Sequence, residues 1–268
     1  MTKGIASWGW STVPQKHMNS LVLRFTQAKV IGGGSSINAQ LYNRGNRLDF
    51  DEWRQMGCQG WSYDDVLPCF RRIEDFARPS GKYHGKVGPL GVSDPVAPLP
   101  VCEAYFKAAG ELGIPHNADF NGESQDGVGY YQLSQMNARR SSTATAYLKP
   151  ARGRPNLDVR TDAFVNRVVI ENGRATGVEV TGRYGVETIR ADREVILASG
   201  AIGSPRLLMQ SGVGPADHLK SVGITALHGL PGVGSNFQDH LDLFIICEST
   251  GDHHDCREGL RSDPRPLS

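Results

Sequence analysis

The spacing of apolar residues predicts helices in the first part of the chain and strands in the later part. Ser62 and Asp65 have the spacing of a capping box, so a helix should begin after Ser62, with Pro68 kinking or dividing it. The apolar face of this helix comprises Val66, Phe70 and Ile73. A second helix is predicted from Pro100 to Gly113, because apolar residues recur there at helical intervals and glycine often follows a helix end.

After Leu157 apolar and polar residues alternate, with many valines and isoleucines, which predicts a small antiparallel meander. Asn172-Gly173 suits a two-residue hairpin turn within it. The run from Val195 to Ala198 is typical of a more buried strand that ends the meander. A short helix should follow, delimited by Ser204 as N-cap, Pro205 at the first position and Gly212 past the end.

The composition changes this picture mainly by exclusion. A chain of 268 residues allows one large domain or two of ordinary size, and 39% hydrophobic with 21% charged residues is ordinary for a globular protein. The net charge of +1, without long runs of one sign, gives no indication of a nucleic-acid or membrane-surface partner. No apolar run approaches the ~18 residues that a membrane span needs, and the first residues lack the apolar core of a signal peptide.

Five scattered cysteines without CxxC spacing favour a reducing compartment over a structural metal, so we expect a cytoplasmic protein without a metal site. The tail from Gly251 has almost no apolar residues and is expected to be disordered. We interpret the group His253, His254, Asp255 and Cys256 in this tail as a chance cluster, since a zinc site would need a second ligand pair.

The stretch from Ala28 to Gly45, AKVIGGGSSINAQLYNRG, is rich in small residues. Glycine lacks a Cβ, so the backbone N–H groups of three consecutive glycines can approach a ligand closely. Together with the side chains of Ser35, Ser36 and Asn38, they could form a concave set of donors for a pyrophosphate or for the polar edge of a large cofactor. The stretch is neither GxGxxG nor GxxxxGK[ST]. Taken alone, it is better explained as a tight turn with close backbone packing.

Read together, several stretches resemble the glucose-methanol-choline (GMC) oxidoreductase family of flavoproteins, which oxidise alcohols and related donors. AKVIGGGSSINAQLYNRG, with LDFDEW after it, matches the first family signature, and GAIGSPRLLMQSGVG, from Gly200 to Gly214, matches the second. Further segments in family order are GWSYDDVLPCFRRIED, GPLGVSDP, DFNGESQDGVGYYQ, RRSSTATAYLKPARGRPNL and GVGSNFQDH. The similarity runs from about Trp8 to His240.

The resemblance implies FAD as the cofactor, with the glycine-rich stretch lying along it. The implied flavin contacts are Val30, Gly33, Gly34, Ser35, Asn38, Ala39, Gln40 and Leu41. Val165 resembles the position whose main chain meets the adenine, although a plain core valine remains the alternative. Ile37 stands where some relatives attach FAD through a histidine, so FAD should be non-covalent here. His240, in a segment that resembles one near the flavin, is expected to be structural rather than catalytic.

The resemblance also implies an α/β fold, with an incomplete Rossmann-like FAD-binding domain and an α+β substrate domain. We assign residues 1–59 and 151–250 to the FAD-binding domain, 60–150 to the substrate domain and connecting segments, and 251–268 to the tail. The chain departs from the family pattern at both ends. No GxGxxG follows a strand, and no segment corresponds to the one that carries the catalytic histidine of the family.

The sequence therefore predicts a truncated portion of a FAD-dependent oxidoreductase acting on CH–OH donors, with a small alcohol as substrate of the full-length relative. Alone it should be inactive, with no catalytic residue of its own, and should bind free FAD weakly or not at all. A non-catalytic remnant or interaction module without FAD binding is the main alternative. A nicotinamide-dependent dehydrogenase and a lyase are lesser ones, and the first of these would need the missing dinucleotide fingerprint.

Overall fold

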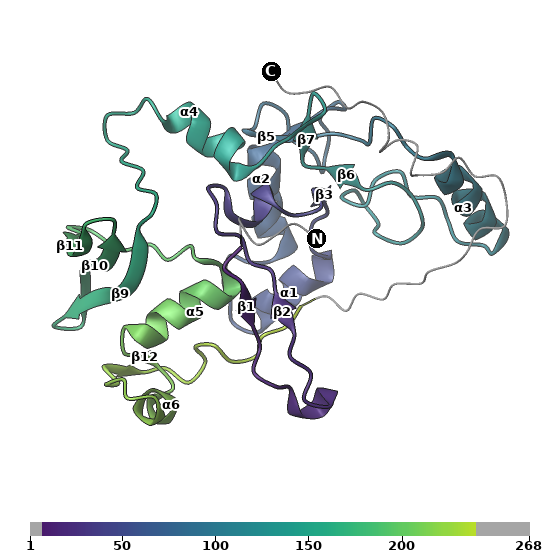
Figure 1. Ribbon diagram of the computed structural model, residues 1–268. Helices are drawn as coiled ribbons and strands as arrows, with labels where there is room; N and C mark the ends of the chain where they lie inside the picture. The colour runs from purple at the N-terminus through teal and green to yellow at the C-terminus, as the bar shows by residue number, and fades with distance from the viewer. Residues whose placement is uncertain (1–6, 240–268) are drawn as a thin grey trace, which may run out of the picture. The chain divides into compact units, whose positions relative to one another are not determined.

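The structure of the protein, a computed structural model, describes residues 7–239 (Figure 1). These residues form two compact units, residues 7–157 and residues 158–239. Both units combine helices with strands, and the boundary between them falls where the sequence pattern changes from helical to alternating. His240 and the predicted tail, with its group of histidines, lie outside the described residues.

The first unit consists of short elements joined by long connections (Figure 1). Its helices are η1 (Lys16–Met18), η2 (Gly33–Ser36), α1 (Arg47–Gln55), α2 (Tyr63–Ile73), α3 (Pro100–Glu111), η3 (Ala144–Leu148) and α4 (Lys149–Ala151). Its antiparallel pairs are β1 (Trp10–Ser11) with β2 (Arg24–Phe25), β3 (Leu41–Tyr42) with β6 (Gln132–Leu133), and β7 (Gln135–Met136) with β8 (Arg139–Arg140). One pair is parallel, β4 (Glu74–Phe76) with β5 (Leu90–Val92).

Helix α2 begins at the predicted capping box. Ser62 Oγ accepts the backbone N–H of Asp65, and a carboxylate oxygen of Asp65 accepts the backbone N–H of Ser62 at 3.1 Å. The helix then continues through Pro68, so of the two expected effects, a kink or a division, the division does not occur. Pro68 has no N–H to donate to the carbonyl of Asp64, one turn earlier in the helix. Both residues are exposed, so water can bind that carbonyl instead.

Helix α3 has the predicted extent, and Gly113 follows its end with a φ of +80°. Only Ala109 of this helix is buried, whereas Val101, Tyr105 and the following Leu112 are exposed in the described part of the chain. The core of the first unit lies elsewhere, around the aromatic side chains of α1, α2 and β4. Its buried apolar side chains are those of Phe50, Tyr63, Phe76, Val92, Ala109, Phe120 and Ala146.

The second unit is built on the predicted meander, which is confirmed (Figure 1). Strands β9 (Phe164–Glu171), β10 (Arg174–Gly182) and β11 (Gly185–Arg190) form an antiparallel sheet in the order β11-β10-β9. Asn172 and Gly173 turn the first hairpin with φ values of +52° and +75°, as a two-residue turn of this kind requires.

Helix α5 (Gly200–Gln210) packs against β9. Ser211 fixes the contact, because its hydroxyl donates to the carbonyl of Leu207 at 2.6 Å and accepts the backbone N–H of Val168 at 2.7 Å. Beyond it, β12 (Val213–Gly214) and β13 (His228–Gly229) form a parallel pair joined through α6 (Ala216–Ser221).

Two expectations for this unit are wrong. The run from Val195 to Ala198 is not a strand: no strand in residues 7–239 pairs with it, and Ile196 is 78% exposed. A strand needs a neighbour to take up its backbone hydrogen bonds, and hydropathy alone cannot supply one. Helix α5 begins at Gly200 rather than after Ser204. The Ser204 hydroxyl instead accepts the backbone N–H of Ser199 at 3.1 Å, inside the helix.

Three cysteines of the described residues, Cys58, Cys69 and Cys102, are free. Among residues 7–239, no helix combines the length and apolar character that crossing a bilayer would require.

Candidate functional site

The glycine-rich loop, residues 30–41, contains the short helix η2 and leads into β3. Gly32 has a φ of +90°, and a Cβ at this position would collide with the hydroxyl of Ser36. Gly33 also has a left-handed backbone, with a φ of +55°. These two glycines are therefore explained by the turn itself, as the bare-turn interpretation of the sequence requires.

Gly34 is different, because neither its backbone nor its surroundings require a glycine. Its φ is not positive, and a Cβ built on Gly33 or Gly34 meets no further atom of the described residues within 4 Å. Exposed apolar side chains lie on the same loop, namely those of Val30, Ile31, Ile37 and Leu41, and Leu41 is 56% exposed. A bare backbone flanked by exposed apolar groups fits a large flat ligand that approaches the loop closely.

The segment from Arg140 to Thr143 holds the loop in place. The hydroxyl of Ser35 accepts the backbone N–H of Thr143 at 2.9 Å and donates to the carbonyl of Gly32 at 2.6 Å. Thr143 Oγ1 donates to the same carbonyl at 3.1 Å. One guanidinium nitrogen of Arg140 donates to the carbonyl of Ser35 at 3.0 Å and to the side-chain oxygen of Asn38 at 2.7 Å.

These bonds change the interpretation of the two serines. Ser35 is bonded to Thr143 and Gly32, and the hydroxyl of Ser36 donates to the carbonyl of Ile31 at 2.8 Å. Both hydroxyls therefore serve the shape of the loop. Sequence reasoning missed Arg140 and Thr143, because more than one hundred residues separate them from the loop they contact.

The end of the loop is fixed by the strands of the same unit. Gln40 has a φ of +66°, and its carbonyl accepts both the backbone N–H of Ser134 at 2.8 Å and the Ser134 hydroxyl at 3.1 Å. Its side-chain oxygen accepts a bond from Gln135 at 3.1 Å. Leu41 and Tyr42 then pair with β6. The loop is thus anchored on both sides, while Ala39 between the anchors is exposed.

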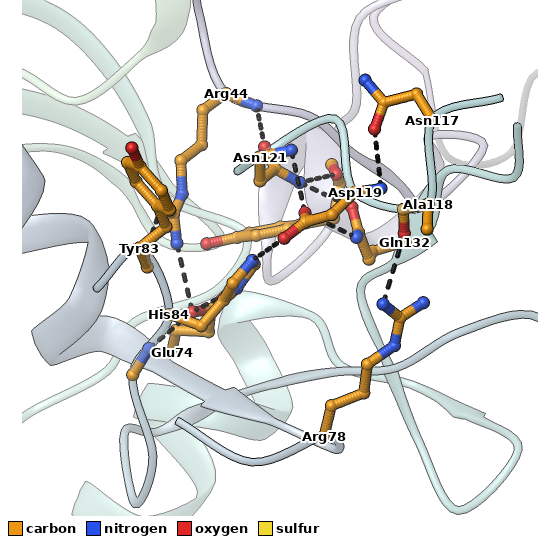
Figure 2. Close-up of polar contacts among 12 residues, drawn as sticks. Arg44, Glu74, Arg78, Tyr83, His84, Asn117, Ala118, Asp119, Asn121 and Gln132 are labelled. Carbon is orange, nitrogen blue, oxygen red and sulfur yellow. Dashed lines mark hydrogen bonds and ion pairs between the residues drawn. The ribbon is translucent and has the colours of Figure 1, made fainter. Parts of the chain in front are cut away.

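A buried network of charged side chains lies next to this strand pair (Figure 2). Glu74 is fully buried and accepts bonds from Arg44 at 3.1 Å and from the backbone N–H of Gly85 at 2.8 Å. Figure 2 shows the His84 ring between Glu74 and Asp119. Its Nδ1 lies 3.1 Å from a Glu74 oxygen, and its Nε2 lies 2.9 Å from a carboxylate oxygen of Asp119.

Two amide side chains connect this network to β3. Asn121 donates to the carbonyl of Tyr42 and to the side-chain oxygen of Gln132, both at 2.8 Å, and accepts the backbone N–H of Arg44 at 2.7 Å. Gln132, which is fully buried on β6, donates to Asp119 at 2.9 Å. The network therefore extends from the 74–85 segment to the strand on which the glycine-rich loop ends.

The charges of this network shift the pKa values of its members. Burial lowers the pKa of His84, but hydrogen bonds to Asp119 and Glu74, together with their charges, outweigh this effect and raise it to about 8. Burial would raise the pKa of Asp119, yet the hydrogen bond and charge of His84 hold it below its usual range. Burial, followed by the charge of Glu74, raises the pKa of Tyr42.

Val165, the predicted adenine contact, lies on β9 in the second unit and pairs with Val180. It is half-buried, and the register shifts at this point, so that Asn166 is the extra residue of a bulge. The eight other predicted residues all lie together in the glycine-rich loop of the first unit. Within residues 7–239, no three or more histidine, cysteine, aspartate or glutamate side chains are placed so that they could hold a metal ion.

Comparisons with known proteins agree with this picture. A family profile described as GMC oxidoreductase matches residues 11–242. The chain is 43% identical over 244 residues to the oxygen-dependent choline dehydrogenase of Sinorhizobium fredii, and 44% identical over 243 residues to that of Brucella ovis. Each match covers 91% of this chain but 44% of the relative, so the chain spans less than half the length of these curated relatives.

Solved structures give the same answer for the fold. Pyridoxine 4-oxidase from Mesorbium loti matches with a TM-score of 0.79 at 35% identity, over 84% of this chain and 45% of that one. A FAD-dependent oxidoreductase from Chaetomium thermophilum matches with a TM-score of 0.80 at 32% identity, and the match covers 85% of this chain and 42% of that one. These likenesses confirm the expected α/β fold class and FAD as the cofactor of such proteins.

Proposed function

Because the chain belongs to the GMC oxidoreductase family, with FAD as its cofactor, we propose that it contributes to the FAD site of an enzyme that oxidises the CH–OH group of a small alcohol. One observation carries the proposal. Gly34, which has neither a positive φ nor a neighbour among the described residues that would exclude a side chain, lies on a loop that exposes several apolar side chains, and this combination is best explained by a ligand.

Different residues of the loop have different roles in binding this ligand. Gly33 and Gly34 allow the backbone to approach a ring, and Val30 and Leu41 cover it against water. Asn38 is oriented by Arg140, which leaves the amide nitrogen of its side chain to donate. When bound, FAD would accept the hydride from the alcohol carbon. Ile37 has no nucleophilic atom, so the cofactor would be held without a covalent bond.

We propose a small alcohol of the choline class as the substrate, because the curated relatives described above are choline dehydrogenases. Of the two outcomes expected for these 268 residues alone, weak binding of free FAD or none, we propose weak binding without turnover of an alcohol, since they contain the glycine-rich loop but no GxGxxG after a strand. The assignment of residues 60–150 to a substrate domain, the role of Val165 and a cytoplasmic location also remain predictions.

Amide hydrogen exchange of the whole chain, with and without millimolar FAD, tests the site. We expect slower exchange in residues 30–42, with no change in the α3 segment as an internal control. AMP alone and riboflavin alone separate the two halves of the cofactor: riboflavin should protect the glycine-rich loop, whereas AMP should not. Absence of any FAD-dependent protection in this loop, or protection confined to other segments, would overturn the proposal.

A further inference from the structure

His84 is buried between two carboxylates that come from separate segments of the first unit. Its Nδ1 faces both carboxylate oxygens of Glu74, at 3.2 and 3.1 Å, and its Nε2 faces Asp119 at 2.9 Å. The ring also stacks on Phe76, with centroids 4.0 Å apart, which fixes its plane. The imidazole therefore has a partner on each nitrogen and little freedom to turn.

The partners determine the protonation state of this ring. An ionised carboxylate only accepts hydrogen bonds, so both ring nitrogens of His84 must donate, and only the imidazolium form has two donors. Glu74 also accepts bonds from Arg44 and from the backbone N–H of Gly85, so every partner on this carboxylate is a donor. Asp119 likewise accepts the backbone N–H of Asn121 at 3.1 Å. The network then has two positive groups, Arg44 and the His84 imidazolium, and two carboxylates, so its net charge is zero.

The bridge has a consequence for the glycine-rich loop. Asp119 holds Gln132 of β6, and β6 pairs with β3, on which the loop ends. Without the proton on His84, a ring nitrogen would present its lone pair to a carboxylate, and the network would carry one uncompensated negative charge. Glu74 and Asp119 would each keep other donors, but the tie between their segments would be lost.

We propose that His84 is a positioning residue for the cofactor loop: as an imidazolium it ties Glu74 to Asp119 and thereby fixes the β3–β6 pair at which residues 30–41 end. This inference rests on the proposed FAD site in that loop. It adds a dependence on protonation that the loop residues themselves do not have, because none of the described residues 30–41 titrates near neutral pH.

Other charged or titratable groups near the ring are already engaged. Arg78, whose guanidinium lies over the Phe76 ring, is paired with Asp94 at 2.6 Å. On the same β4 segment, Asp75 lies 4.0 Å from Lys86. Arg44, from the segment after β3, also donates to the carbonyl of Tyr83 at 2.7 Å. Among these groups around the ring, His84 is therefore the one expected to change charge between neutral and mildly basic pH.

The proposal is tested by amide hydrogen exchange of the wild-type chain and of the variant His84→Gln. Exchange is measured between pH 6 and 9.5 and corrected for the intrinsic rates. A glutamine can bond one carboxylate but not both. We expect the wild-type protection of residues 30–44 and 130–134 to fall as pH rises through about 8. The difference between a pKa of about 8 and the ordinary value of 6.5 corresponds to a factor of about 30 in an equilibrium constant. The protection factors of these residues should therefore fall by at most about 30-fold.

In His84→Gln the same residues should be poorly protected at every pH, with no step, while β9 and β10 remain unchanged. His218→Gln, at an exposed position, is the matched control and should behave as the wild type. If His84→Gln retains both the protection and its pH course, the proposal is wrong. If the variant does not fold, ¹⁵N spectra of wild-type His84 decide: a ring with only one protonated nitrogen at pH 7 would equally overturn it.

The dissociation constant for FAD separates this inference from the proposed function. We expect it to rise with pH in the wild-type chain, following the loss of loop protection, and to show no such step in His84→Gln. If the chain binds no FAD at any pH, the proposed function fails, whereas the exchange data still decide whether His84 holds the loop. If FAD binds with the same pH dependence in both proteins, the positioning role is contradicted.

Discussion

The hydroxyl of Ser35 accepts the backbone N–H of Thr143 at 2.9 Å, although 108 residues separate them in the chain. This bond joins the glycine-rich loop to the segment that precedes η3, and the carbonyl of Gly32 receives the hydroxyls of both residues. The shape of the loop is thus set by a distant segment as well as by its own glycines. A rigid loop is required if it is to hold a cofactor without reorganising on binding.

Ser35→Ala should lower the free energy of unfolding by about 1–2 kcal/mol, because it leaves the N–H of Thr143 and the carbonyl of Gly32 each without one bond. Urea unfolding followed by tryptophan fluorescence measures the change. Ser80→Ala, at an exposed position in the same unit, is the control and should be close to neutral. Equal stability of the two variants would show that the Ser35 bonds do not hold the loop.

Arg140→Gln should loosen the loop without unfolding the unit. The substitution removes the bonds to Asn38 and to the carbonyl of Ser35, which at this half-buried position together contribute about 1 kcal/mol. We expect faster amide exchange in residues 30–41 and weaker FAD binding, with little change in α2. Arg139→Gln is the matched control, since Arg139 is the exposed neighbour on β8. The prediction fails if both arginine variants have the same effect on the loop.

The stability of the first unit should fall above neutral pH. The pKa of His84 is raised to about 8 in the folded protein, so its stabilising effect is fully present below the unfolded value of 6.5 and is lost as pH rises through about 8. The difference corresponds to roughly 2 kcal/mol. Urea unfolding at pH 6, 7, 8 and 9 measures it. A stability that is constant, or that rises over this range, would contradict an imidazolium at this position.

Glu74→Ala should be among the most damaging substitutions in the first unit. It leaves Arg44, whose side chain is 3% exposed, buried without its partner carboxylate, and it removes one partner of His84. Loss of one partner of a buried pair typically costs about 3–5 kcal/mol. Glu111→Ala, at the exposed end of α3, should be nearly neutral by comparison. Thermal unfolding of both variants measures the difference, and a small effect at Glu74 would show that the network is dispensable.

Local signals in the sequence predicted local structure well. The capping box at Ser62, the turn at Asn172-Gly173 and the glycine after α3 all depend on neighbouring residues, so they could be recognised from the sequence. The run from Val195 to Ala198 failed because a strand requires a partner that hydropathy does not reveal. Motif order identified the family and its cofactor, as the comparisons confirm.

The connections around the glycine-rich loop could not be predicted in the same way. Arg140 and Thr143 contact the loop across more than one hundred residues. The tie between Glu74 and Asp119 through His84 joins two segments that meet only in the folded unit. No periodicity or spacing in the sequence encodes such contacts. The candidate contacts themselves, from Val30 to Leu41, were found through the resemblance, and their role toward FAD remains a prediction.

The most direct test compares FAD binding by two variants of the chain, Gly34→Ala and Gly110→Ala. Neither added Cβ meets an atom of the described residues within 4 Å, and neither glycine has a positive φ, so both variants should fold as the wild type. We predict that Gly34→Ala loses FAD-dependent protection of residues 30–42, because its methyl group would occupy the space of the ligand, while Gly110→Ala retains it. Equal FAD binding by the two variants would contradict a cofactor lying against this loop.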